Sequence, residues 1–529
     1  MARPTLHTAQ EIARRIEQGL WDETTLSDIV EANSGSLPGR LALTDSAGTL
    51  NWETVQRLVT TLAAALASRF DRDAVLALCL PNSARQFIFR VACEAAGVVC
   101  APVLAALGPA DVARVVTTLN ADAVVAPPAA LHSLRKHGLS CPCIAVEASD
   151  GQLLAEKVIA SLPAQATATH RQGSRAFGAA EVSFLLGTSG TTGAPMFVEH
   201  GACHRLAQWR RNAQILGLGR DDVFGLLSPH PGGVSLPGFF GAPLLGAHTV
   251  FLESFDPGTA LDLVQEHEVT IACVVPTQLR RMAEEAGRRG ISPMVAIRCW
   301  WCAGAPLTPE LAAQAEETLG GVVLNVYGAT DWGGETWTTP EEPPHLRLGT
   351  VGKPRDGTCI RIVSATGESL TAGHVGEVQG SGPNCVSGYW KDHEANANRW
   401  TPDGWFKTGD AGSLGEDGYL RITGRFSDTI IRGGQNVHPA ELEALLQMHP
   451  AVQAAAVVPY SDQELGQRIC AVVVTRGDAE IDLEGAREFL KNREIARFKL
   501  PDRLEIVKEL PHAAGGQKLD RRSIREKIS

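Results

Sequence analysis

A glycine- and hydroxyl-rich stretch follows an apolar run in residues 184–195, FLLGTSGTTGAP. Glycine permits positive φ and close backbone approach, so such a loop can present N–H groups and hydroxyls to a polyphosphate. The stretch is not a Walker loop, because no Gly-Lys-Ser/Thr sequence follows. A flexible Gly/Ser/Thr turn has the same composition. The loop taken alone therefore leaves both interpretations open.

Four further residues suited to chemistry lie in short glycine-containing motifs downstream. Tyr327 and Asp331 belong to NVYGATD, and a carboxylate oxygen is a ligand that Mg²⁺ prefers. Asp410 follows a glycine in TGD, where a turn residue is the more frequent role. Lys518 lies in GGQKL, and an arbitrary lysine is most often a solvated surface residue. Each of these residues taken singly has an ordinary structural explanation.

The elements that must position these residues begin with an alternating pattern in the first half of the chain. Short apolar, β-branched runs alternate with amphipathic stretches, and a similar rhythm returns between residues 249 and 302. This pattern predicts βα units with parallel sheets covered by helices, in at least two layers. The runs in the first such region are residues 74–80, 83–96, 98–103, 110–119 and 123–126.

The pattern changes after residue 403. Turn signals at Asp403-Gly404 and Asp417-Gly418 bound short strand-like runs and predict a β-rich subdomain. A helix from Pro439, strands at 454–459 and 469–474 and a helix at 483–491 are then expected. We therefore predict an α/β protein with a large N-terminal domain, residues 1–424, and a small α+β C-terminal domain, residues 425–529.

Charge and hydropathy exclude several classes of protein. Lys plus Arg number 48 against 59 Asp plus Glu, a formal net charge of −11, which gives no long-range attraction to a nucleic-acid backbone. The N-terminal segment lacks the apolar core of a secretory signal, which favours a cytoplasmic protein. The most apolar window, residues 91–110, is interrupted by Glu94, Gly97 and Pro102. It predicts a buried helix followed by a strand instead of a membrane span.

The 12 cysteines lie mostly in apolar runs. Two close pairs, Cys141 with Cys143 and Cys299 with Cys302, lack neighbouring His or Cys residues at ligand spacing. We expect core thiols and no structural metal.

Taken together, the motifs resemble the adenylate-forming superfamily of acyl- and aryl-CoA synthetases, peptide-synthetase adenylation domains and beetle luciferase. The matching segments occur in family order and span essentially the whole chain, which chance does not explain. They are TSGTTGAP (188–195), AGAPL (303–307), NVYGATD (325–331), TGD (408–410), GRFSD (424–428), GGQNVHPAELE (433–443) and GGQKL (515–519).

The resemblance implies an ATP site. Within it, the loop would hold the β- and γ-phosphates, Gly304 to Pro306 would line the adenine, Tyr327 would stack on the base, and Asp410, supported by Arg425, would accept hydrogen bonds from the ribose. The implied ATP-binding residues are Thr188, Ser189, Gly190, Thr191, Thr192, Gly193, Gly304, Ala305, Pro306, Asn325, Tyr327, Gly328, Asp410 and Arg425.

The resemblance also implies catalytic roles for Thr330 at the α-phosphate, Asp331 as the Mg²⁺ ligand, and Lys518. The Lys518 ammonium would stabilise charge on the attacking carboxylate and the α-phosphate. The acyl pocket would include His230, Gly304, Trp332 and Gly333, and the glycines Gly433 and Gly434 would border a tunnel for coenzyme A.

Three positions depart from the family pattern. Met196 stands where a lysine usually follows the loop proline, so one phosphate-neutralising charge is missing. Asp331 replaces the usual Glu and is one methylene shorter, with Glu335 as an alternative ligand. Ser427 stands where the domain hinge usually has Asp or Lys.

The predicted function is ATP- and Mg²⁺-dependent, AMP-forming activation of a small carboxylic acid with an uncharged side chain, whether aryl, alicyclic or medium-chain. Thioester formation with coenzyme A would follow. Two alternatives stay open at this point: an aryl-acid loader of a carrier protein, and a non-catalytic adenylate- or acyl-binding module.

Overall fold

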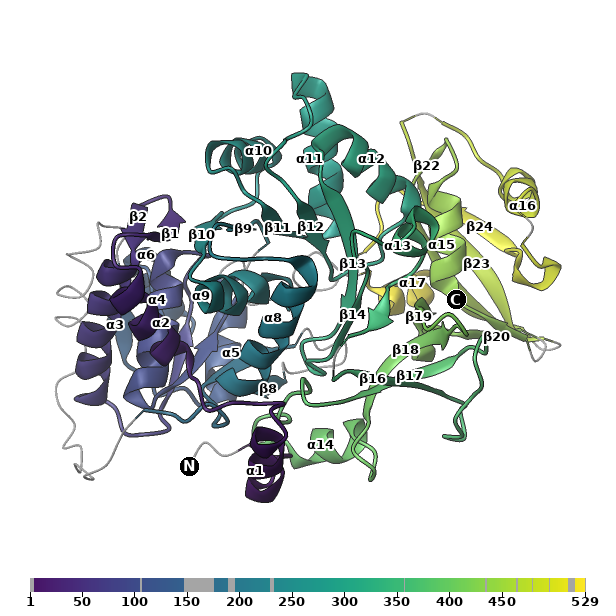
Figure 1. Ribbon diagram of the computed structural model, residues 1–529. Helices are drawn as coiled ribbons and strands as arrows, with labels where there is room; N and C mark the ends of the chain where they lie inside the picture. The colour runs from purple at the N-terminus through teal and green to yellow at the C-terminus, as the bar shows by residue number, and fades with distance from the viewer. Residues whose placement is uncertain are drawn as a thin grey trace. The chain divides into compact units, whose positions relative to one another are not determined.

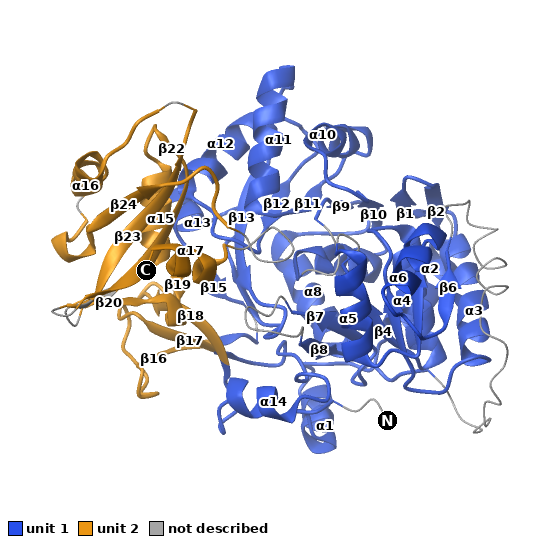
Figure 2. Cartoon of the chain, turned by 180° about the vertical axis from the view of Figure 1, so that it is seen from behind, with its two compact units in different colours: residues 1–359, 380–406 blue, residues 360–379, 407–529 orange. Residues whose placement is uncertain are grey.

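The computed structural model describes residues 4–104, 107–146, 176–188, 196–228, 233–355, 357–432, 435–462, 465–477, 479–493, 495–511 and 519–528. The chain forms two compact units (Figure 2). Unit 1 comprises residues 1–359 and 380–406, and unit 2 comprises residues 360–379 and 407–529.

The first sheet of unit 1 has the strand order β6-β5-β3-β4-β7-β8 in the described residues. Its pairs are parallel except for β7 with β8, which form an antiparallel hairpin. The strands are β3 (Val75–Leu78), β4 (Val99–Pro102), β5 (Ala123–Ala126), β6 (Cys143–Ala145), β7 (Phe184–Gly187) and β8 (Phe197–His200). The helices α4 (Ala84–Ala96), α5 (Pro109–Leu119) and α6 (Pro128–Lys136) connect them.

The second sheet of unit 1 has the described order β15-β14-β13-β12-β11-β9-β10-β1-β2. Its central strands are parallel, and antiparallel strands close both edges. The strands are β1 (Leu41–Asp45), β2 (Gly48–Asn51), β9 (Val223–Leu226), β10 (His248–Phe251), β11 (Ile271–Val274), β12 (Cys299–Cys302), β13 (Val322–Gly328), β14 (Glu335–Trp337) and β15 (Lys353–Pro354).

Further helices of unit 1 pack around its two sheets (Figure 1). They are α1 (Ala9–Glu17), α2 (Leu26–Ser36), α3 (Trp52–Ala67), α8 (Ala202–Leu216), α9 (Ala242–Leu245), α10 (Pro257–Glu266), α11 (Pro276–Arg289), α12 (Pro309–Leu319), α13 (Pro344–Gly349) and α14 (His393–Arg399), with a 3₁₀ turn η1 (Gly233–Ser235) and a π-helical turn η2 (Pro237–Gly241). The parallel sheets with helical crossovers confirm the predicted α/β class.

Local sequence explains where several helices begin and end. Thr25 caps α2 in a reciprocal capping box with Asp28, which satisfies backbone donors that the first turn leaves free. Helix α4 ends at Gly97, whose φ of 69° suits a residue without a Cβ. The predicted buried helix and following strand at 91–110 are confirmed as the second half of α4 and β4.

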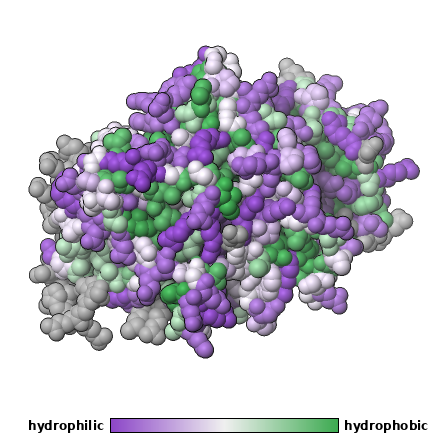
Figure 3. All heavy atoms as spheres, viewed as in Figure 1, coloured by the Kyte–Doolittle hydropathy of each residue, from purple (hydrophilic) through white to green (hydrophobic). Residues whose placement is uncertain are grey.

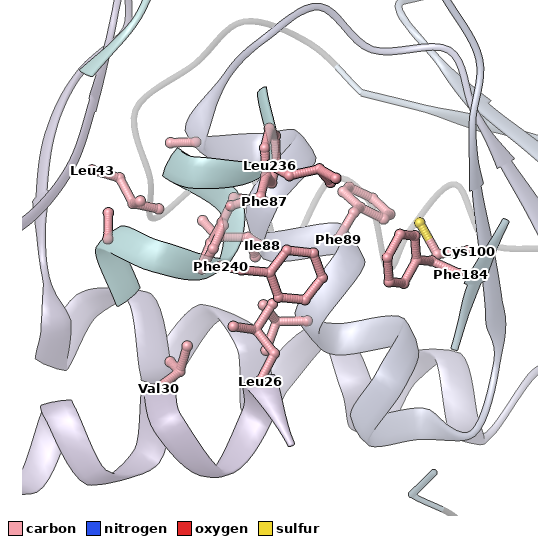
Figure 4. Packing of buried hydrophobic residues seen from close by; sticks show 14 of the residues in the cluster. Leu26, Val30, Leu43, Phe87, Ile88, Phe89, Cys100, Phe184, Leu236 and Phe240 are labelled. Carbon is pink, nitrogen blue, oxygen red and sulfur yellow. The ribbon is translucent and has the colours of Figure 1, made fainter. Parts of the chain in front are cut away.

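The largest core joins the two sheets of unit 1. Leu26 of α2, Phe87 and Ile88 of α4, and Phe240 of η2 gather within it (Figure 4). Full burial of one such side chain stabilises the fold by about 1.5–3 kcal/mol. Phe184, the first residue of β7, belongs to the same cluster. The strand that leads to the glycine-rich loop is therefore anchored in the core.

Unit 2 contains two β-sheets in its described residues. One has the order β16-β17-β18-β19, with β16 (Cys359–Val363), β17 (Gly376–Ser381), β18 (Phe406–Leu414) and β19 (Leu420–Arg425). The other has the order β21-β20-β23-β22 with β24 beside β23, formed by β20 (Ile430–Arg432), β21 (Gln435–Val437), β22 (Val452–Asp462), β23 (Gly466–Thr475) and β24 (Arg503–Ile506). Its helical segments are α15 (Pro439–Gln447), α16 (Leu483–Lys491), α17 (Arg521–Ile528), η3 (Phe426–Asp428) and η4 (Arg497–Lys499).

The predicted elements of the C-terminal region are confirmed in α15, β22, β23 and α16. The compact units also group residues 360–379 and 407–424 with this region, because β16 to β19 form one sheet. The sequence instead predicts a boundary between residues 424 and 425. That the two parts of the chain move relative to each other at this boundary stays a prediction.

The surface is mainly hydrophilic on the face shown in Figure 3, with apolar residues interspersed. In the described ranges, no helix combines the length and the apolar character that crossing a membrane requires. The cysteines of the chain are free thiols, and most are buried.

Candidate active site

The β7–β8 hairpin carries the glycine-rich loop at its tip. Gly187 pairs with Phe197, and the amide of Thr188 donates to the carbonyl oxygen of Met196 at 2.8 Å. This hydrogen bond closes the neck of the loop. Residues 189–195 lie outside the described residues, so of the predicted phosphate-binding set the structure describes Thr188 alone.

Asp331 follows strand β13 on a segment that returns along β14. The hydroxyl of Tyr389 donates to Oδ2 of Asp331 at 2.8 Å. The Tyr389 side chain is completely buried. Burial, together with the nearby Asp331 carboxylate, raises the pKa of the phenol, so that it remains a donor at neutral pH. Within the described ranges, Oδ1 of Asp331 has no hydrogen-bond partner.

The next two residues are fixed by the segment 384–386. The buried indole of Trp332 donates to Sγ of Cys385 at 3.1 Å, and the amide of Val386 donates to the carbonyl oxygen of Trp332 at 2.9 Å. Gly333 has a φ of 82°, and a Cβ there would lie 2.7 Å from the carbonyl oxygen of Asn384. Only glycine fits this position without strain.

Helix α8 also contacts the segment that contains Gly333. Nη1 of the buried Arg205 donates to the carbonyl oxygen of Gly333 at 3.0 Å and to Oε1 of Gln208 at 2.9 Å. Burial lowers the pKa of Arg205 to about 10, which leaves it charged at neutral pH. Burial and the Arg205 charge lower the pKa of His200 well below its usual range. The neutral imidazole accepts from Nε of Arg205 through Nδ1 at 3.4 Å.

Glu335, the alternative metal ligand, is engaged with α8. Its Oε1 accepts a hydrogen bond from Nδ2 of Asn212 at 2.5 Å. Burial raises the pKa of its carboxyl, while the Asn212 hydrogen bond and the Arg205 charge lower it. This contact favours a positioning role for Glu335 over metal binding. The Mg²⁺-binding role of Asp331 stays a prediction.

The predicted adenine-binding residues follow strands β12 and β13. Gly304 to Pro306 are exposed, and Gly304 has a φ of 90°. A Cβ at Gly304 would lie 3.5 Å from Val234 and from Val275, whereas one at Gly233 would lie 3.8 Å from Oγ1 of Thr330. The turn η1 therefore lies beside both Gly304 and Thr330, at the carboxyl ends of parallel strands. Such an edge is where open α/β sheets bind ligands.

The remaining adenine-site candidates differ in their surroundings. Nδ2 of the buried Asn325 donates to the carbonyl oxygen of Thr350 at 2.8 Å, which fixes its side chain within unit 1. The ring of Tyr327 is partly exposed, with its centroid 6.1 Å from that of Trp332. Gly328 is exposed at the end of β13. Tyr327 and Gly328 are thus accessible to a ligand, whereas the Asn325 side chain is engaged in a hydrogen bond to the backbone.

In unit 2, the two predicted ribose-site residues form an ion pair. Asp410 of β18 and Arg425 of β19 are directly opposite in the antiparallel register, and Nη1 of Arg425 lies 3.0 Å from Oδ1 of Asp410. Arg425 also donates to the carbonyl oxygen of Thr408 at 3.2 Å. Arg425 thereby orients the Asp410 carboxylate.

Several predicted site residues lie outside the described residues. They are the loop residues Ser189, Gly190, Thr191, Thr192 and Gly193, together with His230, Gly433, Gly434 and Lys518.

The donor chemistry of unit 1 is compatible with Mg²⁺. Within the described residues no group of three or more His, Cys, Asp or Glu side chains lies together as a metal cage. Mg²⁺ is usually held by one or two carboxylates plus the phosphates of its substrate. Asp331, with one oxygen held by Tyr389, fits that kind of site.

Sequence reasoning did not predict Tyr389 or Arg205. Tyr389 is 58 residues from Asp331, and Arg205 is 128 residues from Gly333. Neither lies in a motif with local spacing that identifies it, so no signal within one sequence pointed to these contacts.

Two segments of the chain match known protein families. A family model described as AMP-binding enzyme matches residues 30–390, and one described as AMP-binding enzyme C-terminal domain matches residues 441–517. The chain is 34% identical over 353 residues to a salicylyl-CoA synthase / salicylate adenylyltransferase of a Streptomyces species, covering 66% of this chain and 63% of that protein. It thus spans less than two thirds of the length of that relative.

Two other similarities extend over nearly the full chain. The chain is 27% identical over 519 residues to a medium-chain fatty-acid–CoA ligase of Escherichia coli K12, covering 95% of this chain and 90% of that protein. The crystal structure of ATP-bound MatB from Rhodopseudomonas palustris matches with a TM-score of 0.78 and 26% identity, covering 95% of this chain and 99% of that one.

Proposed function

Because the chain belongs to the AMP-binding enzyme family, we propose that it activates a carboxylic acid with ATP and then transfers the acyl group to a thiol. In the first step the carboxylate attacks the α-phosphate, forming an acyl adenylate and releasing pyrophosphate. In the second step a thiol attacks the acyl carbon and AMP leaves. Coenzyme A is the proposed thiol.

One observation in unit 1 carries the proposal. Tyr389 forms a β-bridge with Val198 of β8, and its hydroxyl donates to Asp331. Strand β8 begins immediately after the glycine-rich loop. A single residue thus joins the exit strand of the loop to the acidic residue of the NVYGATD motif. This link supports a site in which a polyphosphate and a cation lie together.

The roles of the remaining residues follow from charge and position. Thr330, beside η1, is proposed to donate to the α-phosphate. Asp410, oriented by Arg425, accepts hydrogen bonds from the ribose hydroxyls. The ammonium of Lys518 stabilises the negative charge that develops when carboxylate and phosphate meet. Mg²⁺, held by Asp331, neutralises phosphate charge when bound.

The proposed acid has an uncharged side chain. Gly304 is bordered by the apolar Val234 and Val275, and a charged group beside them would lose hydration without a partner. Salicylate and medium-chain fatty acids appear in the names of similar proteins. Aryl, alicyclic and medium-chain acids are therefore the classes to test first.

The test is acid-dependent pyrophosphate release with a panel of such acids, followed by acceptor assays on each active acid. Release with at least one acid and thioester formation with coenzyme A support the proposal. Acyl transfer to a phosphopantetheinylated carrier protein, without transfer to coenzyme A, identifies a loader instead. ATP binding without pyrophosphate release from any acid contradicts the enzymatic proposal and favours a non-catalytic module.

A further inference from the structure

The contact between Tyr389 and Asp331 is built from a rigid donor. The Tyr389 ring is completely buried and packs edge-on against Trp400, with 5.5 Å between the ring centroids. Its backbone N–H donates to Oδ1 of Asn396 at 2.8 Å, and Nδ2 of Asn396 donates back to the Tyr389 carbonyl oxygen at 3.0 Å. Ring and backbone are thus both fixed, and the hydroxyl has one well-defined position.

The chain around Tyr389 runs alongside strand β8. The amide of Glu199 donates to the carbonyl oxygen of Gly388, and the amide of Trp390 donates to that of Phe197, both at 2.8 Å. With the Val198–Tyr389 bridge, these bonds attach residues 388–390 to the strand that leaves the glycine-rich loop. The position of the Tyr389 hydroxyl is therefore set by the base of that loop.

The same segment also holds the backbone beside Asp331. The amide of Val386 donates to the carbonyl oxygen of Trp332 at 2.9 Å, one residue beyond the carboxylate. Asp331 is thereby held at its side chain by Tyr389 and at the neighbouring peptide by Val386. Both contacts belong to unit 1.

We propose that Tyr389 is a positioning residue that orients the Asp331 carboxylate for Mg²⁺ by occupying Oδ2 and leaving Oδ1 for the cation. This role rests on the proposed function and adds a positioning residue to its cation site. The side chain of aspartate is one methylene shorter than that of glutamate. If the Asp331 carboxylate turned away from the phosphates, the short side chain could not bring it back within reach of a cation bound to them. A fixed hydroxyl donor restricts the carboxylate to one orientation before the cation arrives, which lowers the cost of ordering it.

The test removes one oxygen atom. Tyr389→Phe keeps the buried ring and deletes the donor, whereas Tyr460→Phe deletes the same atom in unit 2 and serves as the matched control. ATP binding is measured by calorimetry at a series of Mg²⁺ concentrations, together with the thermal midpoint of each variant. We expect the half-saturating Mg²⁺ concentration to rise about ten-fold in Tyr389→Phe, as for one lost hydrogen bond to a charged group. We expect no such change in Tyr460→Phe.

A double-mutant cycle with Asp331→Asn separates positioning from general support of the fold. Once the carboxylate charge is gone, adding Tyr389→Phe should change the Mg²⁺ dependence by less than about two-fold, because the two residues act through one contact. Equal effects of Tyr389→Phe in both backgrounds would overturn the proposal. So would a wild-type Mg²⁺ dependence in Tyr389→Phe.

Failure of this inference is distinguishable from failure of the proposed function. Absence of acid-dependent pyrophosphate release in the wild-type protein contradicts the function, while the Mg²⁺ dependence of ATP binding still tests Tyr389. An active wild-type enzyme whose Tyr389→Phe variant binds ATP with unchanged Mg²⁺ dependence contradicts the inference alone.

Discussion

Arg521 donates from both terminal nitrogens to the two carboxylate oxygens of Glu443, at 2.5 and 2.7 Å. Its Nε also lies 3.2 Å from Oδ2 of Asp428, the residue after Ser427. Arg521 comes three residues after Lys518. Within unit 2, the segment that follows Lys518 is therefore attached both to helix α15 and to the start of the predicted C-terminal domain. A rotation of that domain would carry these parts together.

Replacing Lys518 by Ala should impair the first half-reaction selectively. We expect acid-dependent pyrophosphate exchange to fall by a factor on the order of 10² or more, the loss typical of a missing electrostatic partner in the transition state. Thioester formation from supplied acyl adenylate should survive. Lys508→Ala, at an exposed lysine of the same unit, is the control. The family resemblance implies that the mobile C-terminal domain takes one arrangement for adenylation and another for transfer to the thiol. Equal losses in both half-reactions would contradict this hypothesis.

A side chain at Gly434 should block the second half-reaction. In Gly434→Leu we expect adenylate formation to be retained and transfer to coenzyme A to be lost, because the side chain would obstruct the tunnel that the family resemblance implies at this glycine. The two half-reactions are assayed separately. Gly287→Leu is the control, since a Cβ at Gly287 meets no atom within 4 Å. Undiminished thioester synthesis in Gly434→Leu would remove the tunnel assignment.

Met196→Lys tests the missing charge at the neck of the loop. Both side chains are long and unbranched, and Met196 is partly exposed, so the fold should tolerate the change. We expect a lower KM for ATP if the ammonium reaches the phosphates in a desolvated contact, and no measurable change if the contact is solvent-exposed and contributes under about 1 kcal/mol. ATP titrations of the two proteins side by side decide the matter. Lost activity in a folded variant would show that this loop departs from the family path.

Glu199 should make the stability of unit 1 depend on pH. Burial raises its pKa to about 7, although Thr5 donates to the carboxylate from its amide at 2.8 Å and its hydroxyl at 2.6 Å. The folded form therefore holds a proton that the unfolded chain, with an ordinary pKa near 4.5, releases. Wild-type stability from this group is present below about pH 4.5 and is lost as the pH rises through 7.

Glu199→Gln removes that titration. We expect the variant to be more stable than the wild type at pH 8 by on the order of 3 kcal/mol, and the difference to shrink toward pH 5. Unfolding midpoints at both pH values measure the change. Glu284→Gln, at an exposed position on α11, should show no comparable dependence. A difference that stays constant between pH 5 and pH 8 would mean that Glu199 does not titrate in this range.

The sequence predicts features of this fold that depend on local chemistry. The helix from Pro439 and the strands now seen as β22 and β23 follow from a proline at the helix start and from apolar periodicity, which act over a few residues. The fold class follows from the alternation of such elements. The motif residues near η1, β12 and β13 were identified through their family resemblance.

Contacts that cross long stretches of chain could not be predicted in this way. The hydrogen bond from Tyr389 to Asp331 depends on a bridge between the 388–390 segment and β8, which no local pattern encodes. The sequence predicts that Trp332 lines the acyl pocket, but it does not predict that the Trp332 indole donates a hydrogen bond to Cys385. Such contacts depend on how the sheets pack, and they require the folded structure.

The two-unit organisation has an optical consequence. The chain contains 10 tryptophans, and every one falls within residues 1–359 or 380–406, which form unit 1. Three buried indole rings form a row, with the ring centroid of Trp301 lying 5.2 Å from that of Trp209 and 5.4 Å from that of Trp337. Indole emission therefore reports on unit 1 alone. An acceptor dye attached within residues 425–529 would receive energy from tryptophans that all lie outside that segment. Its sensitised emission would therefore report the predicted movement of the C-terminal domain without any engineered donor.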